Sequence, residues 1–215
     1  MSDKPLIVYW NICGRAHLAR AMLHAGNVAY DLDSATANSW PAPKSECPFG
    51  QLPILKHGDL VLAQSGAITR YCARIAGLVP EDAVGAAKVD MILEECADLY
   101  NLMIKAKYPT NPTKEEKIAA WGKIKNEFLP AHLGCLERIL DKSTHPFFGG
   151  VSPNAADVAF TATYGVYQLA GFPESTLDAF PGLKHVVSET SKIGSLSAFE
   201  PGGPYFTCDE NHKMF

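Results

Sequence analysis

The sequence predicts an α/β domain followed by an all-helical domain, and three observations lead to this prediction. Short apolar runs with strand composition alternate with helical patterns over residues 1–80. A segment with proline, glycine and acidic residues, VPEDAVGAA, follows at 79–87, and the strand patterns stop there. We therefore expect an α/β domain at residues 1–79, a linker at about 79–86 and an all-helical C-terminal domain at 86–215.

Each element of the N-terminal domain has its own local signal. The expected strands lie at 6–10, 28–32, 52–55 and 59–63, and the expected helices lie at 15–26 and 65–78. The first helix ends at a Gly-Asn stop, and a short turn with Gly58 joins the last two strands as a hairpin. The order β-α-β, long loop, β-β-α is that of a thioredoxin-like module.

The C-terminal domain begins with two long helical patterns. An apolar stripe from Val89 to Ile104 predicts the first helix, and Asp90, Glu94 and Asp98 form an acidic line along it. The second helix is expected at about 114–141, with a bend at Pro130. Its expected core positions are Ile118, Trp121, Phe128, Leu136, Ile139 and Leu140.

A third helix is predicted to open at the NAAD segment, residues 154–157. Asn154 is the expected N-cap, and Asp157 at the third helical position favours the helix dipole. The helical pattern weakens after Phe180, and residues 200–215 are read as an irregular tail that either covers a site or is disordered.

Composition excludes several classes of function. The net charge of −4 favours neither nucleic acid nor an anionic membrane as a partner. No apolar run approaches the roughly 18 residues of a membrane span, and the N-terminal residues show no signal peptide. The six cysteines make no CxxC pair and no metal-ligand cluster. We expect a cytoplasmic protein with reduced thiols and no bound metal.

Three blocks of sequence resemble the cytosolic glutathione transferases, and the sigma class in particular. They are YWN…GRA..AR at 9–20, W…K…PFGQLPIL at 40–55 and LAQSGAITRY at 62–71. The spacing from Trp40 to Lys44 suits the sigma class better than the pi class. The resemblance implies an enzyme of detoxification that joins the thiolate of glutathione to small, mostly hydrophobic electrophiles.

The resemblance implies which residues hold glutathione, and several have a physical reason. Gln64 and Ser65 begin a helix, where free N–H groups favour an anion, so they are expected to hold the γ-glutamyl carboxylate. Ser65 is expected to serve as the N-cap of this helix as well. Leu52-Pro53 is expected to be a cis peptide that offers the Leu52 backbone to the ligand as an added strand would. Trp40 and Lys44 are expected at the glycine end, and Gln51 beside the same strand.

Tyr9 is the expected thiolate stabiliser. Because a free thiol has a pKa of about 8.5, little of it is ionised at neutral pH, and a phenol that donates to the sulfur lowers that pKa. Arg15 is expected to add positive charge or to organise the loop. Cys13 lies close to the expected sulfur position, but with Tyr9 present we interpret it as a semi-buried residue, and Cys47 as a bystander. His17 is expected to face solvent or to pair within its helix.

The resemblance also implies a homodimer, in which Asp98 reaches the glutathione of the neighbouring subunit. A pocket for the electrophile is expected from residues of both domains: Trp10, Ile12, Cys13, Tyr100, Met103, Ile104 and Tyr164. Two other functions stay open. One is a glutathione-dependent isomerase of the prostaglandin D synthase type, and the other is a non-catalytic, crystallin-like or ligand-binding protein.

Overall fold

Short strands form in the first third of the chain because runs of β-branched and leucine residues are separated there by turn residues. The computed structural model describes residues 4–107 and 113–199, so the predicted tail at 200–215 lies outside the described residues. The strands are β1 (Leu6–Val8), β2 (Asp31–Asp33), β3 (Ile54–His57) and β4 (Leu60–Ala63). They form one sheet in the order β2-β1-β3-β4, in which only the β1–β2 pair is parallel.

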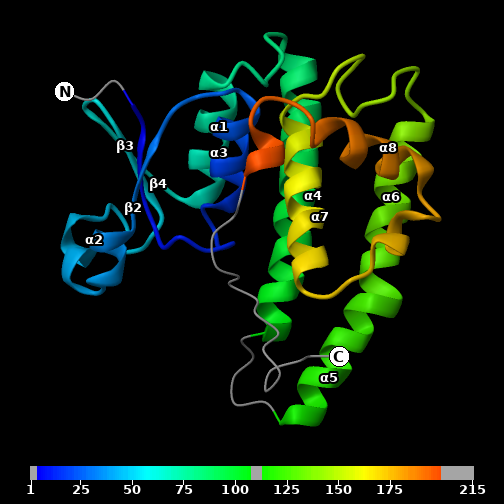
Figure 1. Ribbon diagram of the computed structural model, residues 1–215, viewed down its shortest axis with the longest axis horizontal. Coiled ribbons are helices and arrows are strands. Elements are labelled where there is room, and N and C mark those ends of the chain that lie inside the picture. The colour runs from blue at the N-terminus through cyan, green and yellow to red at the C-terminus, as the bar shows by residue number, and fades with distance from the viewer. Residues whose placement is uncertain (1–3, 108–112, 200–215) are drawn as a thin grey trace. The chain divides into compact units, whose positions relative to one another are not determined.

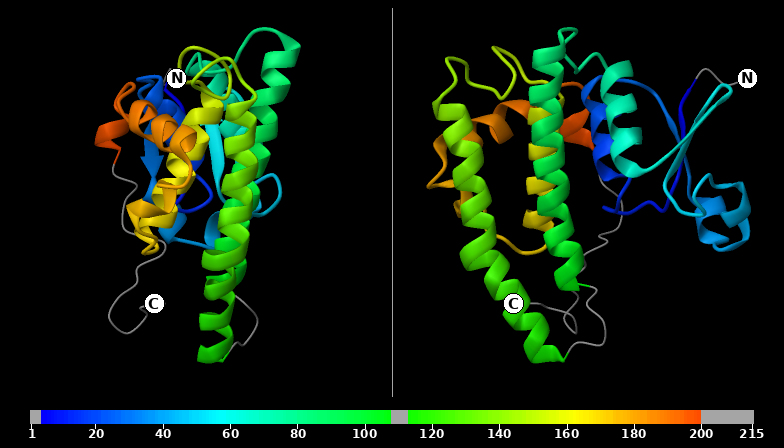
Figure 2. Two further views of the ribbon diagram at one scale, coloured as in Figure 1. Left: turned by 90° about the vertical axis from the view of Figure 1, so that its right-hand side faces the viewer. Right: turned by 180° about the vertical axis from the view of Figure 1, so that it is seen from behind.

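Helices cover both faces of this sheet. They are α1 (His17–Ala25), α2 (Ser34–Asn38), the 3-10 turn η1 (Ala42–Glu46) and α3 (Ser65–Ile75). Helices α1 and α3 pack against each other on one side of the sheet, and α2 lies on the other side (Figures 1 and 2). The element order confirms the predicted βαβ-ββα arrangement, with α2 and η1 in the long loop.

The second strand is shorter and later than predicted. The N–H of Val28 donates to the carbonyl of Leu23 at 2.8 Å, so this residue still belongs to the end of α1. Pairing with β1 begins only at Asp31, which lies opposite Leu6. The apolar pattern at 28–32 therefore includes a helix-terminating residue as well as the strand.

The following residues form a separate helical unit, and it confirms the predicted all-helical class. Its elements are α4 (Ala83–Lys107), α5 (Lys114–Lys123), the π-helix η2 (Ile124–Phe128), α6 (Leu129–Asp141), α7 (Ala155–Leu169), η3 (Glu174–Leu177) and α8 (Pro181–Thr190). Within this unit α4 packs along α7, and α8 packs against both α6 and α7. The Tyr167 hydroxyl donates to the Leu99 carbonyl at 2.8 Å and ties α7 to α4.

The second long helix continues through Pro130, the residue at which a bend is expected. A π-helical turn, η2, ends at Phe128, two residues before Pro130, which has no N–H to donate to the preceding turn. This wider turn shifts the helical register, so Leu129 is buried and Phe128, a predicted core residue, is exposed. Ile118 is also exposed, because α5 extends past the end of α7 (Figure 1).

Helix α7 opens as predicted. The Asn154 side chain accepts from the N–H of Ala156 at 2.8 Å, and Asp157 accepts from the N–H of Asn154 at 2.9 Å. The second oxygen of Asp157 accepts from the N–H of Phe148 at 3.0 Å, so the carboxylate also holds the preceding loop. Asn154 is confirmed as the N-cap, and Asp157 as its reciprocal partner.

The segment 192–199 packs with the first unit, although the sequence assigns it to the C-terminal domain. The N–H of Ser195 donates to the carbonyl of His24 at 2.9 Å, and the Phe199 ring lies 4.6 Å from the His24 ring. The His17 ring stacks on Phe199 at 5.2 Å and is buried, so the expectation that His17 faces solvent is wrong. A contact between residues so far apart in the chain has no local sequence signal.

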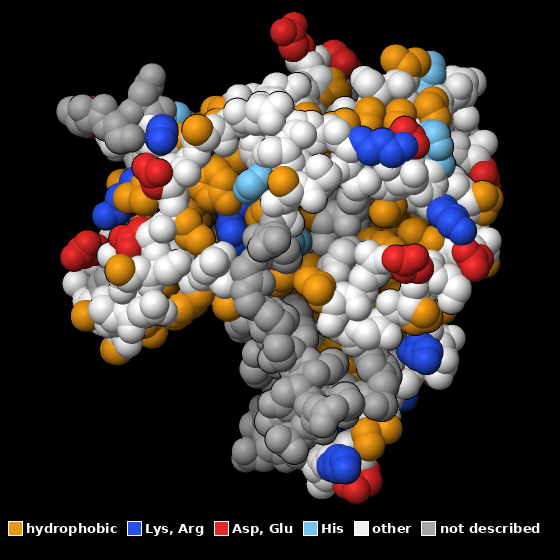
Figure 3. Space-filling view, in the orientation of Figure 1, with side chains coloured by type: hydrophobic (Ala, Val, Ile, Leu, Met, Phe, Trp, Pro, Cys, Tyr) orange, Lys and Arg blue, Asp and Glu red, His pale blue; other side chains and the backbone are white. Residues whose placement is uncertain are grey.

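The surface carries charges of both signs. Acidic and basic side chains are interspersed over the helical unit on the face shown in Figure 3. Among residues 4–107 and 113–199, no helix is both long and apolar enough to cross a membrane. Within the same residues, no group of three His, Cys, Asp or Glu side chains could hold a metal ion.

Candidate functional site

The first unit contains an open pocket of about 400 Å³. Four loops build it: the β1–α1 loop, the long loop before β3, the entry to β3 and the β4–α3 junction. Its lining residues are Trp10, Arg15, Trp40, Phe49, Gln51, Leu52, Pro53, Ala63, Gln64 and Ser65. All except Phe49 and Ala63 are predicted site residues, so eight of the ten lining residues were predicted from the sequence.

The β4–α3 junction presents a helix N-terminus to the pocket. The first hydrogen bond of α3 runs from the N–H of Ile68 to the carbonyl of Gln64, so the earlier N–H groups of the helix face outward. Gln64 has φ 71° and ψ 118°, a conformation that a residue with a side chain rarely adopts. Strain of this kind is found at binding sites, and the N–H groups and helix dipole favour an anion here.

The helix cap itself differs from the prediction. Gln64 is the N-cap and Ser65 is the first helical residue, and no side chain makes a capping hydrogen bond. The Ser65 side chain therefore does not serve as the expected cap of α3. The strained backbone of Gln64 explains the difference, because it turns the chain sharply between β4 and α3.

The entry to β3 contains the expected cis peptide. The Leu52-Pro53 bond is cis, and β3 begins at the next residue. The Trp40-Pro41 bond is also cis, which the sequence did not predict. Trp40 and Leu52 line the pocket on one side, and on the other they pack against a small core of Val8, Cys47 and Ile54.

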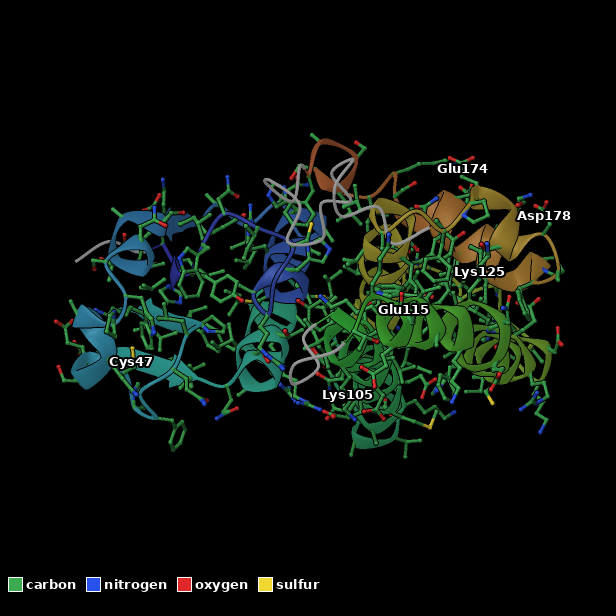
Figure 4. The ribbon with its side chains drawn as sticks, turned by 90° about the horizontal axis from the view of Figure 1, so that it is seen from below. Cys47, Lys105, Glu115, Lys125, Glu174 and Asp178 are labelled. Atoms are coloured by element: carbon green, nitrogen blue, oxygen red, sulfur yellow. The ribbon has the colours of Figure 1, made fainter. Side chains whose placement is uncertain are left out.

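Cys47 therefore has a packing role. It is buried, and Figure 4 shows it in the first unit, between the helical turns after β2 and the strands of the sheet. Its contacts are with the apolar side chains that support the pocket wall. The adjacent Phe49 is 66 % exposed and lines the pocket, so the Cys-Pro-Phe sequence contributes its aromatic residue to the site.

Lys44 does not line the pocket in this structure. It is exposed in η1, and its side chain lies over Gly50, where a Cβ atom would be 3.2 Å from Lys44 Cε. Gly50 has φ +60°, which suits glycine. This contact has no signal in the sequence, and it places the Lys44 side chain against the loop that carries Phe49 and Gln51.

Tyr9 lies directly after β1 and is almost fully buried. The N–H of Arg15 donates to its hydroxyl oxygen at 3.0 Å, and the ring contacts Trp10 edge-to-face with centroids 5.3 Å apart. Trp10 and Arg15 both line the pocket, so the phenol lies immediately behind its wall. The side chain is positioned by the loop that follows it and not by the strand alone.

Cys13 is poorly suited to nucleophilic chemistry. Burial raises the pKa of its thiol to about 11, despite the lowering effect of the Arg20 charge. A thiol with this pKa is almost entirely protonated at neutral pH, and the thiolate is the nucleophilic form. Cys13 is 1 % exposed, so it is more deeply buried than the semi-buried residue that was expected. Ile12, the residue directly before Cys13, is partly exposed.

The remaining predicted residues belong to the helical unit. Asp98 is exposed on α4, whereas Tyr100 and Met103 are buried and Ile104 is partly buried. Tyr164 is buried, and its hydroxyl donates to the carbonyls of Pro173 and Glu174 at 3.3 and 3.4 Å. Glu174 lies in η3, which this hydroxyl fastens to α7 (Figure 4).

Comparison with known proteins agrees with this geometry. The family model described as glutathione S-transferase, N-terminal domain, matches residues 6–74, and the model of the C-terminal domain of the same family matches residues 97–200. The chain is similar to glutathione S-transferase 1 of Ascaris suum, with 30% identity over 207 residues that cover 93% of this chain and 98% of the relative.

Two further comparisons point the same way. Glutathione S-transferase P of Bos taurus is 32% identical over 200 residues, covering 90% of each chain. The solved structure of a Pi-class glutathione S-transferase of Onchocerca volvulus superimposes with a TM-score of 0.78 at 26% identity, covering 91% of each chain. With the pocket, the fold and both domains in agreement, the chain belongs to the glutathione S-transferase family and is a transferase enzyme.

Proposed function

We propose that the pocket binds reduced glutathione and that Tyr9 stabilises its thiolate for attack on a small hydrophobic electrophile. The observation that carries the proposal is the pairing of an anion-favouring helix N-terminus with the Tyr9 phenol behind the wall of the same pocket. Glutathione carries both a carboxylate and a thiol. The helix N-terminus suits the carboxylate, and the Tyr9 phenol suits the thiol.

The reaction needs no nucleophile from the protein. The Tyr9 hydroxyl donates a hydrogen bond to the sulfur, which lowers the pKa of the thiol and raises the fraction of thiolate. The thiolate then forms the carbon–sulfur bond, and the leaving group departs with the electron pair of the bond that breaks. The thiol proton passes to solvent, so Tyr9 stays protonated throughout.

The other pocket residues bind parts of the peptide. The N–H groups at the start of α3, with Gln64 and Ser65, take the γ-glutamyl carboxylate. The Leu52 backbone pairs with the cysteinyl unit, beside Gln51 and Pro53. Trp40 and Lys44 are assigned to the glycine end, and this assignment requires Lys44 to leave its position over Gly50.

A homodimer is the proposed assembly. On α4, Val84 and Met91 are 66 % and 52 % exposed, and with Asp98 they recur every seventh residue along one face of the helix. An exposed apolar line ending at an acid fits a second copy of the chain, with Asp98 directed to the glutathione of that copy. Phe49, at the rim of the pocket, is a further exposed apolar side chain.

The finer assignments rest on the resemblance. We assign the electrophile contacts to Trp10, Ile12, Cys13, Tyr100, Met103, Ile104 and Tyr164. The two domains are assigned to residues 1–79 and 86–215, although segment 192–199 of the second range packs with the first unit. The spacing of Trp40 and Lys44 favours the sigma class, whereas the relatives include Pi-class and nematode enzymes. Detoxification in the cytoplasm fits the five described cysteines, all of which are free thiols.

Kinetics of a Tyr9→Phe variant test the proposal. We expect normal glutathione affinity, a higher pKa of the bound thiol and conjugation of an activated aromatic halide slowed by about tenfold or more. Tyr71→Phe is the matched control, because its hydroxyl bonds His57 at 2.6 Å and the residue does not line the pocket. Full activity of Tyr9→Phe would refute the assigned role.

Two other outcomes identify the alternative functions. If the wild type binds glutathione but turns over no electrophile, the protein has the binding or crystallin-like role and not the conjugating activity. If it isomerises a prostaglandin endoperoxide and glutathione is recovered unchanged, the isomerase replaces it. Tyr9→Phe should lose the isomerase activity as well, because both reactions require the thiolate.

A further inference from the structure

Gly14 lies unusually close to the Tyr9 phenol. A Cβ atom built at Gly14 would lie 2.5 Å from the Tyr9 hydroxyl oxygen and 2.6 and 2.9 Å from Cε1 and Cζ of the ring. Cβ atoms in proteins essentially never lie this close to a heavy atom of another side chain. Because all three atoms belong to one rigid aromatic ring, the ring cannot make room by bending and would have to move as a whole.

The surroundings leave the ring little room to move. Tyr9 is only 4 % exposed, and Trp10 contacts it edge-to-face. The backbone of the turn is also constrained, since the N–H of Gly14 donates to the Ile12 carbonyl at 2.8 Å and the N–H of His17 donates to the Gly14 carbonyl at 2.9 Å. A methyl group at position 14 would therefore shift the phenol or disrupt this turn.

The next residue makes the contact chemically important. The N–H of Arg15 donates to the Tyr9 oxygen at 3.0 Å, so the oxygen uses a lone pair as an acceptor and the hydroxyl proton remains the donor. A donor to the phenol oxygen also stabilises negative charge there, which makes the hydroxyl a stronger donor to a thiolate. This bond exists only while the ring lies against the backbone at Gly14.

We propose that Gly14 is a positioning residue for the transferase reaction. Its missing side chain lets the Tyr9 phenol lie on the backbone of the turn, where the N–H of Arg15 orients and polarises the hydroxyl toward the sulfur of glutathione. This inference rests on the proposed function of Tyr9. It also gives the backbone of Arg15 a role that does not involve its guanidinium group.

The test compares Gly14→Ala, Tyr9→Phe and the double variant. The readouts are the pH dependence of conjugation, the ultraviolet absorption of the bound thiolate and the affinity for glutathione. We expect Gly14→Ala to raise the pKa of the bound thiol by about one unit, with about tenfold slower conjugation below that pKa and little change in glutathione affinity. The double variant should match Tyr9→Phe, because both changes act on one hydroxyl.

Gly122→Ala is the matched control. Outside the backbone of its own helix α5, no atom of the described residues would lie within 4 Å of a Cβ built at Gly122, so activity and the thiol pKa should stay as in the wild type. A wild-type pH profile for Gly14→Ala, with a defective Tyr9→Phe, would overturn the inference and leave the role of Tyr9 standing. Full activity of Tyr9→Phe would instead overturn the proposed function. Additive losses in the double variant would place the effect of Gly14 elsewhere and overturn the inference.

A second measurement covers the case in which Gly14→Ala fails to fold. The amide proton of Arg15, followed by NMR in the otherwise unaltered chain, should shift upfield in Tyr9→Phe and exchange faster with solvent. Tyr71→Phe should leave this resonance in place. If Tyr9→Phe also leaves it in place, the hydrogen bond does not exist in solution and the inference fails.

Discussion

The Asp157 carboxylate offers a quantitative prediction about the stability of the helical unit. It is fully buried and accepts hydrogen bonds from the N–H groups of Asn154 and Phe148. In Asp157→Asn one oxygen becomes an NH₂ group, so one buried N–H loses its acceptor and faces a donor, at a cost of about 1–3 kcal/mol. The other N–H exchanges a charged acceptor for a neutral one, which costs about 1 kcal/mol more.

The expected loss in the free energy of unfolding is therefore about 2–4 kcal/mol near pH 7.5. For a chain of this size, the midpoint of thermal unfolding should fall by about 5–12 °C. The matched control is Asp178→Asn, because Asp178 pairs with Lys184 at 2.7 Å on the surface, where both side chains are more than half exposed. Such a pair contributes only about 0–1 kcal/mol.

The loss should also depend on pH. Burial raises the pKa of Asp157 from 3.8 to about 6, although the N–H groups of Asn154 and Phe148 oppose the shift. A carboxyl with a raised pKa in the folded state binds protons more tightly when folded, so its contribution is full below pH 3.8 and is lost as the pH rises through 6. The wild type gains this contribution at low pH, whereas Asp157→Asn has no titrating group and does not. The difference in the free energy of unfolding between the two proteins should therefore be about 1 kcal/mol larger near pH 5 than near pH 7.5.

Urea unfolding of the three proteins, followed by circular dichroism at both pH values, measures these differences. The reasoning is refuted if Asp157→Asn is as stable as Asp178→Asn. A loss at neutral pH that shrinks near pH 5 would confirm the hydrogen bonds but contradict the raised pKa.

Three further predictions concern the site and the assembly. Cys13→Ser should conjugate glutathione within about twofold of the wild type, because a thiol with a pKa of about 11 is protonated at neutral pH; loss of activity in a rate assay would contradict this. Gln64→Gly should raise stability by about 1 kcal/mol, by relieving its strained backbone, and weaken glutathione binding by about tenfold. Calorimetry and thermal unfolding measure both effects, and unchanged values would remove Gln64 from the site. Met91→Asp should sediment as a monomer where the wild type sediments as a dimer, and an unchanged mass would exclude this face of α4 as the interface.

The parts that the sequence predicted well depend on neighbours in the chain. The N-cap at Asn154 and its partner Asp157 are three residues apart, and their hydrogen bonds need no other element. The cis peptide before Pro53 and the exposed acidic line with Asp98 are also local features. Spaced motifs then identified the family and most of the residues that line the pocket.

The errors occur where distant residues or backbone geometry decide the outcome. Ile118 and Phe128 fit a helical core pattern but are exposed, because a π-helical turn changes the register and α5 extends past α7. His17 is buried because Phe199, far along the chain, stacks on it. Ser65 has the residue type of an N-cap, but the strained Gln64 takes that position.

By itself, the sequence determined the order of the elements, the family and the residue types of the glutathione pocket, since each is written in spacings between near neighbours. Only the tertiary structure decided how the pocket is supported and how Tyr9 is held. The apolar core behind Trp40 and Leu52 and the close approach of Gly14 to the phenol are contacts in space. A glycine such as Gly14 leaves almost no pattern in a sequence. Its importance is visible only in the structure, where the Tyr9 ring occupies the space that a side chain would fill.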